Sequence, residues 1–96
     1  MSAGKGIRFG QHIKELRIHL CQKSSASKGV RDFIEQHYVN IKKENPRFPI
    51  LIRECSGIQP KMWARYEHGK ESHIPLSSLS SQQVLEAVEN LVQKSA

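Results

Sequence analysis

Apolar and polar side chains alternate along the first predicted strand. Leu16, Ile18 and Leu20 take every second position from residue 15 to residue 21, and the positions between them are mostly polar. A period of two is typical of a strand with one buried face. A second apolar-rich run extends from Ile50 to Cys55, and we expect it to form another strand of similar length.

The segment between these two strands shows the apolar spacing of a helix. Apolar and aromatic side chains recur there on one side of an expected helix, at Val30, Phe33, Ile34, His37, Tyr38 and Ile41. Asn45-Pro46 ends this helix, because the residue before a proline avoids helical geometry. A second helix begins at a capping box made by Ser80 with Gln83. Its apolar stripe consists of Val84, Leu85, Val88, Leu91 and Val92.

The segment between the second strand and the last helix predicts a hairpin. Residues 61–66 and 72–76 are its strands and residues 67–70 its turn, and Pro75 indicates an edge strand because it lacks an N–H. The order is therefore strand–helix–strand–strand–strand–helix, an α/β fold class with a four-stranded mixed sheet and two main helices. The helical crossover makes the first two strands parallel and neighbours in the sheet.

Length and charge restrict the function classes. Ninety-six residues form one domain, and no apolar run reaches the ~18 residues of a membrane span, so we expect no direct membrane insertion. The net charge of +6 favours an acidic protein face, RNA or an anionic lipid surface as partner. Residues 1–14 contain basic residues and no acid, which predicts a basic flexible arm, or alternatively an import signal, ahead of a domain at 15–93 and a tail at 94–96.

The two cysteines offer the main candidate chemistry. Cys21 and Cys55 each close one of the parallel strands, so both thiols lie at the same end of the sheet. Neighbouring strands are about 4.8 Å apart, within the range of Cα separations that a disulfide accepts. Cys-x-x-Cys is not present, because Ser24 follows Cys21 at the fourth position; this weighs against a dithiol oxidoreductase. Reduced structural thiols, a stabilising disulfide, a redox sensor and monothiol exchange remain the alternatives.

No metal or nucleotide site is indicated. The five histidines are scattered and show no short ligand spacing with the cysteines. The segment after the first strand is too irregular for a phosphate-binding glycine loop. We therefore expect no cofactor.

Several runs resemble one family closely. They are Arg17–Gln22 (RIHLCQ), Gly29–Ile34 (GVRDFI), Pro49–Ser56 (PILIRECS), Pro60-Lys61, Trp63–Tyr66 (WARY) and Pro75-Leu76. The chain from Glu15 to about Leu91 is similar to the small thioredoxin-like accessory subunits of mitochondrial respiratory complex I. This resemblance implies a minimal thioredoxin-like fold, a non-catalytic role and no redox cofactor. It also implies a cysteine pair that can close when oxidised.

The resemblance further implies a place in the cell. Such a subunit lies on the matrix side of the mitochondrial inner membrane, bound peripherally, near the NADH-oxidising module and its large iron–sulfur subunit. A related domain occurs in some mitochondrial ribosomal proteins, so RNA binding is the alternative function.

The resemblance also predicts where binding occurs. Thioredoxin-like proteins cover both sheet faces, but residues 56–60 are too few for the middle helix, so we expect one face to stay open. Strand parity places a candidate set of partner-binding residues there: Arg17, His19, Arg53, Trp63 and Arg65. Arginine and tryptophan often dominate protein interfaces. The competing interpretation is a solvated face with a half-buried tryptophan.

Overall fold

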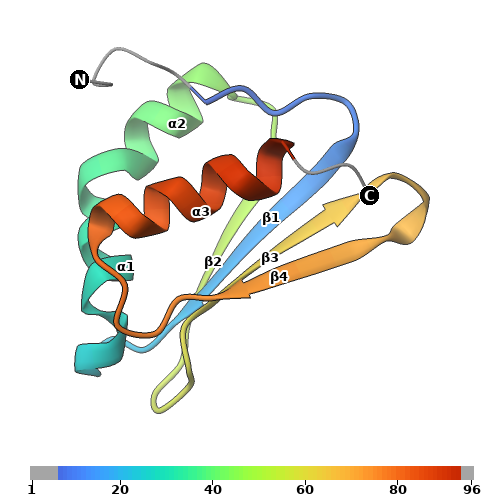
Figure 1. Ribbon diagram of the computed structural model, residues 1–96. Coiled ribbons are helices and arrows are strands. Elements are labelled where there is room, and N and C mark those ends of the chain that lie inside the picture. The colour runs from blue at the N-terminus through green and yellow to red at the C-terminus, as the bar shows by residue number, and fades with distance from the viewer. Residues whose placement is uncertain (1–6, 94–96) are drawn as a thin grey trace.

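Four strands form one mixed sheet in the computed structural model, which describes residues 7–93 (Figure 1). They are β1 (Ile13–Leu20), β2 (Ile50–Glu54), β3 (Lys61–Tyr66) and β4 (Glu71–Pro75). The strand order is β2-β1-β3-β4, with β1 and β2 parallel and the other pairs antiparallel. The parallel pairing of the first two strands is confirmed, as is the edge position of the strand that contains Pro75.

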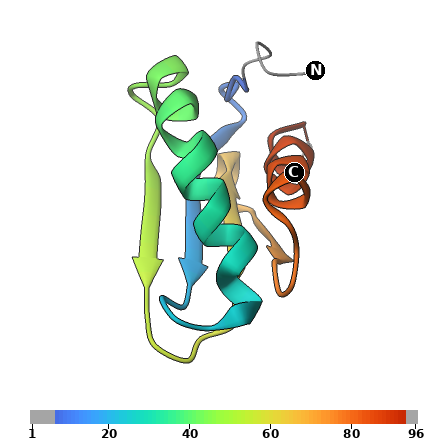
Figure 2. The ribbon, with the colours of Figure 1, turned by 90° about the vertical axis from the view of Figure 1, so that its left-hand side faces the viewer.

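The helices cover one face of this sheet. A continuous rod consists of α1 (Lys28–Phe33), a π-helical segment (Ile34–Tyr38) and α2 (Val39–Glu44), preceded by a 3-10 turn at Ser25–Ser27. Beside it lies α3 (Ser81–Gln93), on the same side of the sheet (Figure 2). Between residues 7 and 93 the opposite face carries no helix. The α/β class, the two main helices and the open face are therefore confirmed, while the thioredoxin-like assignment remains a prediction.

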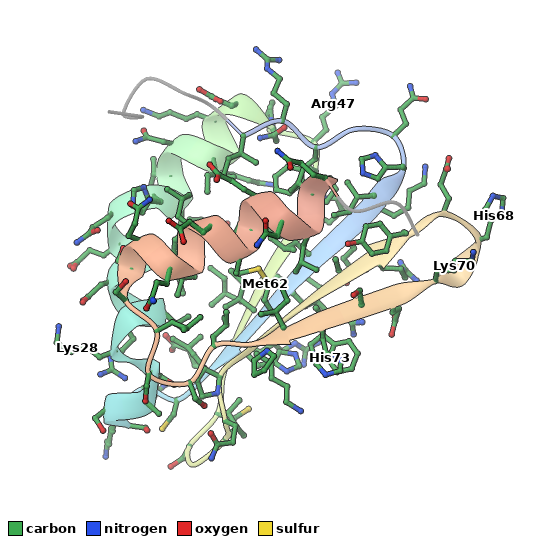
Figure 3. The ribbon with its side chains drawn as sticks, in the orientation of Figure 1. Lys28, Arg47, Met62, His68, Lys70 and His73 are labelled. Carbon is green, nitrogen blue, oxygen red and sulfur yellow. The ribbon has the colours of Figure 1, made fainter. Side chains whose placement is uncertain are left out.

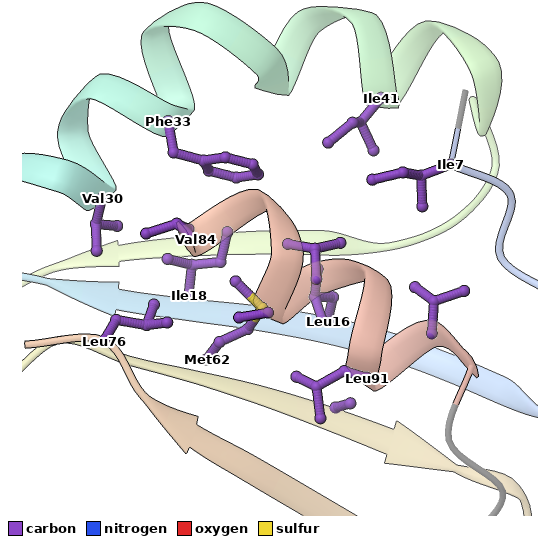
Figure 4. Close-up of a cluster of buried hydrophobic side chains, with 14 of the residues drawn as sticks. Ile7, Leu16, Ile18, Val30, Phe33, Ile41, Met62, Leu76, Val84 and Leu91 are labelled. Carbon is purple, nitrogen blue, oxygen red and sulfur yellow. The ribbon is translucent and has the colours of Figure 1, made fainter. Parts of the chain in front are cut away.

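The core lies between the sheet and the helices (Figure 4). The alternation predicted for β1 is observed, because Leu16, Ile18 and Leu20 are all buried. Met62, Ala64 and Tyr66 are likewise buried on β3. On α3 four of the five predicted stripe residues are buried, whereas Leu85 is only partly buried and Ala87 joins the core. The Tyr66 hydroxyl donates a hydrogen bond to the Leu91 carbonyl oxygen at 2.7 Å, which ties β3 to α3.

Local signals account for the ends of several elements. The Ser80 hydroxyl accepts from the Gln83 N–H at 3.2 Å, and the Gln83 side-chain oxygen accepts from the Ser80 N–H at 2.9 Å. The predicted capping box is thus confirmed at the start of α3. The turn from β3 to β4 needs left-handed backbone at His68 (φ 65°) and Gly69 (φ 74°), which glycine adopts without a steric cost.

The chain before β1 packs against the domain. Ile7 is buried in the core, and the Phe9 ring stacks on Phe48 with centroids 4.0 Å apart. The Asn45 side chain accepts from the Phe9 N–H at 3.1 Å and donates to the Ile7 carbonyl at 2.6 Å. Residues 7–14, which we assigned to the flexible arm, therefore lie against the domain; residues 1–6 fall outside the described part. Partners some 36 positions away cannot be recognised from local composition.

Candidate interaction face and cysteine pair

The face of the sheet without helices exposes every second strand residue. Figure 3 shows His73 projecting away from the helices, whereas Met62 points toward them. This open face carries Glu15, Arg17 and His19 on β1, Leu51 and Arg53 on β2, Lys61, Trp63 and Arg65 on β3, and Glu71 and His73 on β4. All five residues that we predicted for partner binding share it. Whether they bind a partner stays a prediction at this point.

Strand register arranges the open face in three rows. The acidic row consists of Glu15, Arg65 and Glu71. The tryptophan row consists of Leu51, Arg17, Trp63 and His73. The basic row consists of Arg53, His19 and Lys61 and lies next to the cysteine end of the sheet.

Two carboxylates pair with Arg17 and Arg65, two of the three arginines predicted for partner binding. Glu15 pairs with Arg65 at 3.0 Å and with Arg17 at 3.4 Å, and Glu71 pairs with Arg17 at 3.1 Å. Among the described residues, the open face therefore carries unpaired positive charge at one end only, in the basic row. Exposed pairs of this kind add little to stability, but they hold both guanidinium groups in place on the face.

The tryptophan row supplies the apolar part of the open face. The Trp63 ring lies against His73 with centroids 4.5 Å apart and planes tilted by 31°. Leu51 is 41% exposed, and Val39 on α2 is the other strongly exposed large hydrophobic side chain between residues 7 and 93. An indole beside an exposed leucine is a surface that a partner's apolar side chains can cover.

The basic row concentrates positive charge around one imidazole. Burial lowers the pKa of His19, and the neighbouring Arg17, Arg53 and Lys61 lower it further because they repel a second positive charge. Within residues 7–93 neither Arg53 nor Lys61 forms an ion pair. Sequence reasoning omitted Lys61, although its parity with Trp63 was a sufficient signal.

The two cysteines lie at adjoining strand ends. The last register pair of the parallel ladder is Leu20 with Glu54, and the Cys55 N–H donates to the Leu20 carbonyl oxygen at 3.0 Å. The ladder therefore continues to the position where Cys21 and Cys55 follow. Both are free thiols in the structure; Cys21 is buried and Cys55 is exposed.

Backbone donors surround the Cys21 thiol. The N–H groups of Lys23, Gly57 and Ser24 lower its pKa below the ordinary value, partly opposed by burial, and Arg31 lowers it slightly more. The Gly57 N–H lies 3.3 Å from the sulfur. These donors stabilise a thiolate at this position.

Two side chains hold the loop that carries Cys21. The Arg31 guanidinium donates to the carbonyl oxygens of Cys21 at 2.9 Å and Ser24 at 2.8 Å. Arg31 therefore orders this loop and is not merely a solvated charge. The buried Ser27 hydroxyl accepts from the Cys21 N–H at 3.0 Å.

In the described part of the chain, no three side chains of the His, Cys, Asp and Glu types gather as a metal site would require. No helix in residues 7–93 combines the length and the apolar character needed to cross a bilayer.

These features define a small α/β protein with an open, partly charged sheet face and a cysteine at the end of each parallel strand. Residues 30–81 match the family described as the mitochondrial ribosomal protein L51/S25/CI-B8 domain. The chain is 50% identical to NADH dehydrogenase (ubiquinone) 1 alpha subcomplex subunit 2 of Mus musculus, over 95% of this chain and 90% of that protein. Its identity to the Arabidopsis thaliana protein of that name is 55%, over 92% and 91% of the two chains.

More distant relatives include two kinds of protein. The Neurospora crassa NADH-ubiquinone oxidoreductase 10.5 kDa subunit is 43% identical over 92% of this chain and 94% of its own length. The large ribosomal subunit protein mL43 of Mus musculus is 26% identical, and only 46% of that protein is covered. The chain therefore belongs to the L51/S25/CI-B8 domain family, within the group of NADH dehydrogenase alpha-subcomplex subunits 2.

Proposed function

We propose that this chain is a non-catalytic accessory subunit of mitochondrial NADH:ubiquinone oxidoreductase, complex I. The observation that supports it is the identity of 43–55% over more than nine-tenths of this chain to three proteins named as subunits of that enzyme. The ribosomal relative is far more distant and is covered over less than half of its length. The mitochondrial location of this chain follows from its similarity to the three complex I subunits.

The open face is the surface that contacts other subunits of the complex. A half-buried indole, an exposed leucine and arginines held by ion pairs form a preorganised patch, because Arg17 and Arg65 are already positioned by Glu15 and Glu71. Arg17, His19, Arg53, Trp63 and Arg65 are the partner-binding set. The partner is the large iron–sulfur subunit of the peripheral arm, on the matrix side of the inner membrane, as the family resemblance implies.

The absence of a Cys-x-x-Cys motif supports a non-catalytic role. Ser24 occupies the position at which a dithiol oxidoreductase has its resolving cysteine. Its hydroxyl instead accepts from the Ala26 N–H at 3.1 Å and caps the 3-10 turn. Cys21 and Cys55 serve as a redox-sensitive structural pair, without a cofactor.

Replacement of Trp63 by alanine tests the docking role. In cells that lack the native subunit, W63A should be incorporated into complex I several-fold less than the wild type, because the apolar centre of the face is lost. Native gel electrophoresis with quantitative mass spectrometry measures incorporation, and thermal unfolding of the isolated subunit checks the fold. Val39→Ala is the matched control, since Val39 is 56% exposed on the helical side.

Other outcomes contradict the proposal in distinct ways. If W63A alone unfolds the subunit, L51E provides a second test on an exposed edge-strand residue. Normal incorporation of both variants contradicts docking through the open face. Migration of the wild-type subunit with the mitochondrial ribosome, released steeply by salt as phosphate contacts would be, contradicts membership of complex I and supports the RNA-binding alternative.

A further inference from the structure

The basic row carries positive charge that no carboxylate within residues 7–93 balances. Arg53 lies opposite His19 across the parallel pair β1–β2, and Lys61 lies opposite His19 across the antiparallel pair β1–β3. The imidazole between these two cations carries no negative charge, so it does not balance them. The acid that follows Arg53, Glu54, accepts a hydrogen bond from Gln22 at 3.1 Å and has the opposite strand parity.

The rest of the same face shows the contrasting arrangement. Glu15 and Glu71 contact the two arginines of the acidic and tryptophan rows, so those rows carry paired charge. Positive charge therefore accumulates only in the row next to Cys21 and Cys55. Charge is balanced over the acidic and tryptophan rows and is positive in the basic row, so the open face is electrically polarised along the strands.

We infer that the basic row binds aspartate or glutamate side chains of the subunit that covers the neighbouring Trp63 and Leu51. This inference rests on the proposed docking of the open face and names the chemistry of the partner's contact. Arg53 can form a bidentate contact with one carboxylate, and Lys61 offers a point charge to a second oxygen. Electrostatic complementarity of this kind fixes the register of an interface.

Protein carboxylates fit this face better than the phosphates of RNA. A nucleic acid backbone carries regularly spaced negative charge, and along this sheet it would pass from the basic row toward Glu15 and Glu71. Those two carboxylates would repel it. A protein partner can instead place an acidic side chain over Lys61 and an apolar one over Trp63, which is two residues further along β3.

Zero-length cross-linking in intact complex I tests the contact. A water-soluble carbodiimide activates a carboxylate, and the Lys61 amine then displaces the urea leaving group to form an amide. Mass spectrometry should find Lys61 linked to an aspartate or glutamate of another subunit. Lys43, exposed on α2, is the control amine and should lack such a link. Failure to find an inter-subunit link at Lys61 overturns the inference.

Charge reversal tests whether the contact contributes to affinity. The double variant R53E/K61E should be incorporated at least about tenfold less than the wild type, since two charged contacts become repulsive. The matched control K43E/R47E makes the same change of charge at exposed positions outside the open face and should be incorporated normally. A lysine in place of the cross-linked partner carboxylate should restore incorporation of R53E/K61E.

The outcomes separate this inference from the proposed function. Normal incorporation of R53E/K61E together with loss of W63A overturns the carboxylate contact and leaves the docking face intact. Normal incorporation of both contradicts the docking face itself. Ultraviolet cross-linking of the wild-type subunit to RNA, lost in R53E/K61E, assigns the row to phosphates and also overturns the inference.

Discussion

At the scale of single residues, His19 is a direct reporter of the charge in the basic row. Burial lowers its pKa from the ordinary 6.5, and the three surrounding cations add to the shift. We predict that NMR titration of the isolated subunit gives His19 a pKa below 6.5 and that R53Q raises it. Arg47→Gln, which changes an exposed arginine in the turn after α2, should leave the titration unchanged.

The same shift has a consequence for stability. The unfolded chain binds a proton at His19 more readily than the folded chain, so stability should fall as the pH drops from 6.5 through the folded-state pKa. Above 6.5 the imidazole is neutral in both states and contributes no pH dependence. A His19 pKa at or above 6.5 would contradict both the burial of the imidazole and the proximity of the three cations.

Residue parity predicted part of the open face and missed its charge balance. Trp63 and Arg65 were assigned correctly, because alternation along one strand needs no knowledge of its neighbours. The ion-pair partners of the arginines were not predicted. Arg65 contacts Glu15 and Arg17 contacts Glu71, and these pairs lie 50 and 54 positions apart in the sequence. Such pairs depend on the register between strands, which a pattern within one strand does not contain.

At the scale of elements, α1 approaches the segment before α3 very closely at Gly29. A Cβ atom on this buried glycine would overlap the backbone carbonyl group of Leu79. We predict that G29A lowers the free energy of unfolding by at least about 2 kcal/mol, measured by urea denaturation. The helix propensity of alanine favours the variant by only about 1 kcal/mol, so the clash with the backbone dominates.

A neighbouring substitution controls for helix propensity and charge. Lys28 is exposed and pairs with Asp32 at 2.9 Å, so K28A should cost no more than about 0.5 kcal/mol. An equally small effect of G29A would mean that α1 and the start of α3 separate easily. The sequence could not reveal this contact, because a glycine within a helical pattern does not say what lies opposite it.

Most element types were predictable, whereas their details were not. Apolar spacing located the rod from residue 28 to residue 44 but not the π-helical segment at its centre, where one turn takes an extra residue. Likewise β1 begins at Ile13 rather than at Glu15, because its first residues depend on pairing with Tyr66. The capping box at α3 was recognisable because both of its partners lie within four residues.

At the scale of the whole molecule, a short connection determines which surface is available for binding. The loop from Cys55 to Pro60 joins the edge strand β2 to β3 on the far side of β1 without a helix. The open face therefore follows from loop length, which can be read directly from the sequence. Its polarisation from the acidic row to the basic row emerges only once all four strands are in register.

The same topology brings residues of distant sequence position into a redox pair. We predict that oxidised glutathione converts the isolated subunit to an intramolecular Cys21–Cys55 disulfide. Exposed Cys55 first forms a mixed disulfide and releases one glutathione thiolate. The Cys21 thiolate, favoured by surrounding backbone N–H groups, then displaces the second glutathione. Mass spectrometry should show the loss of two hydrogens, and unfolding should become more difficult.

The Cys21–Cys55 disulfide should stabilise the fold by a measurable amount, because it closes a long loop of the chain. Closing a loop of about 35 residues lowers the entropy of the unfolded chain, which raises the free energy of unfolding by roughly 3–4 kcal/mol in the chain-entropy model. That is enough to raise the thermal unfolding midpoint by more than about 10 °C in a domain of this size. C55S should abolish the shift and leave the reduced midpoint nearly unchanged, since Cys55 is exposed. Disulfide-linked dimers would contradict the placement of the two thiols at the ends of adjacent parallel strands. A closed monomer with an unchanged midpoint would contradict the expected stabilisation.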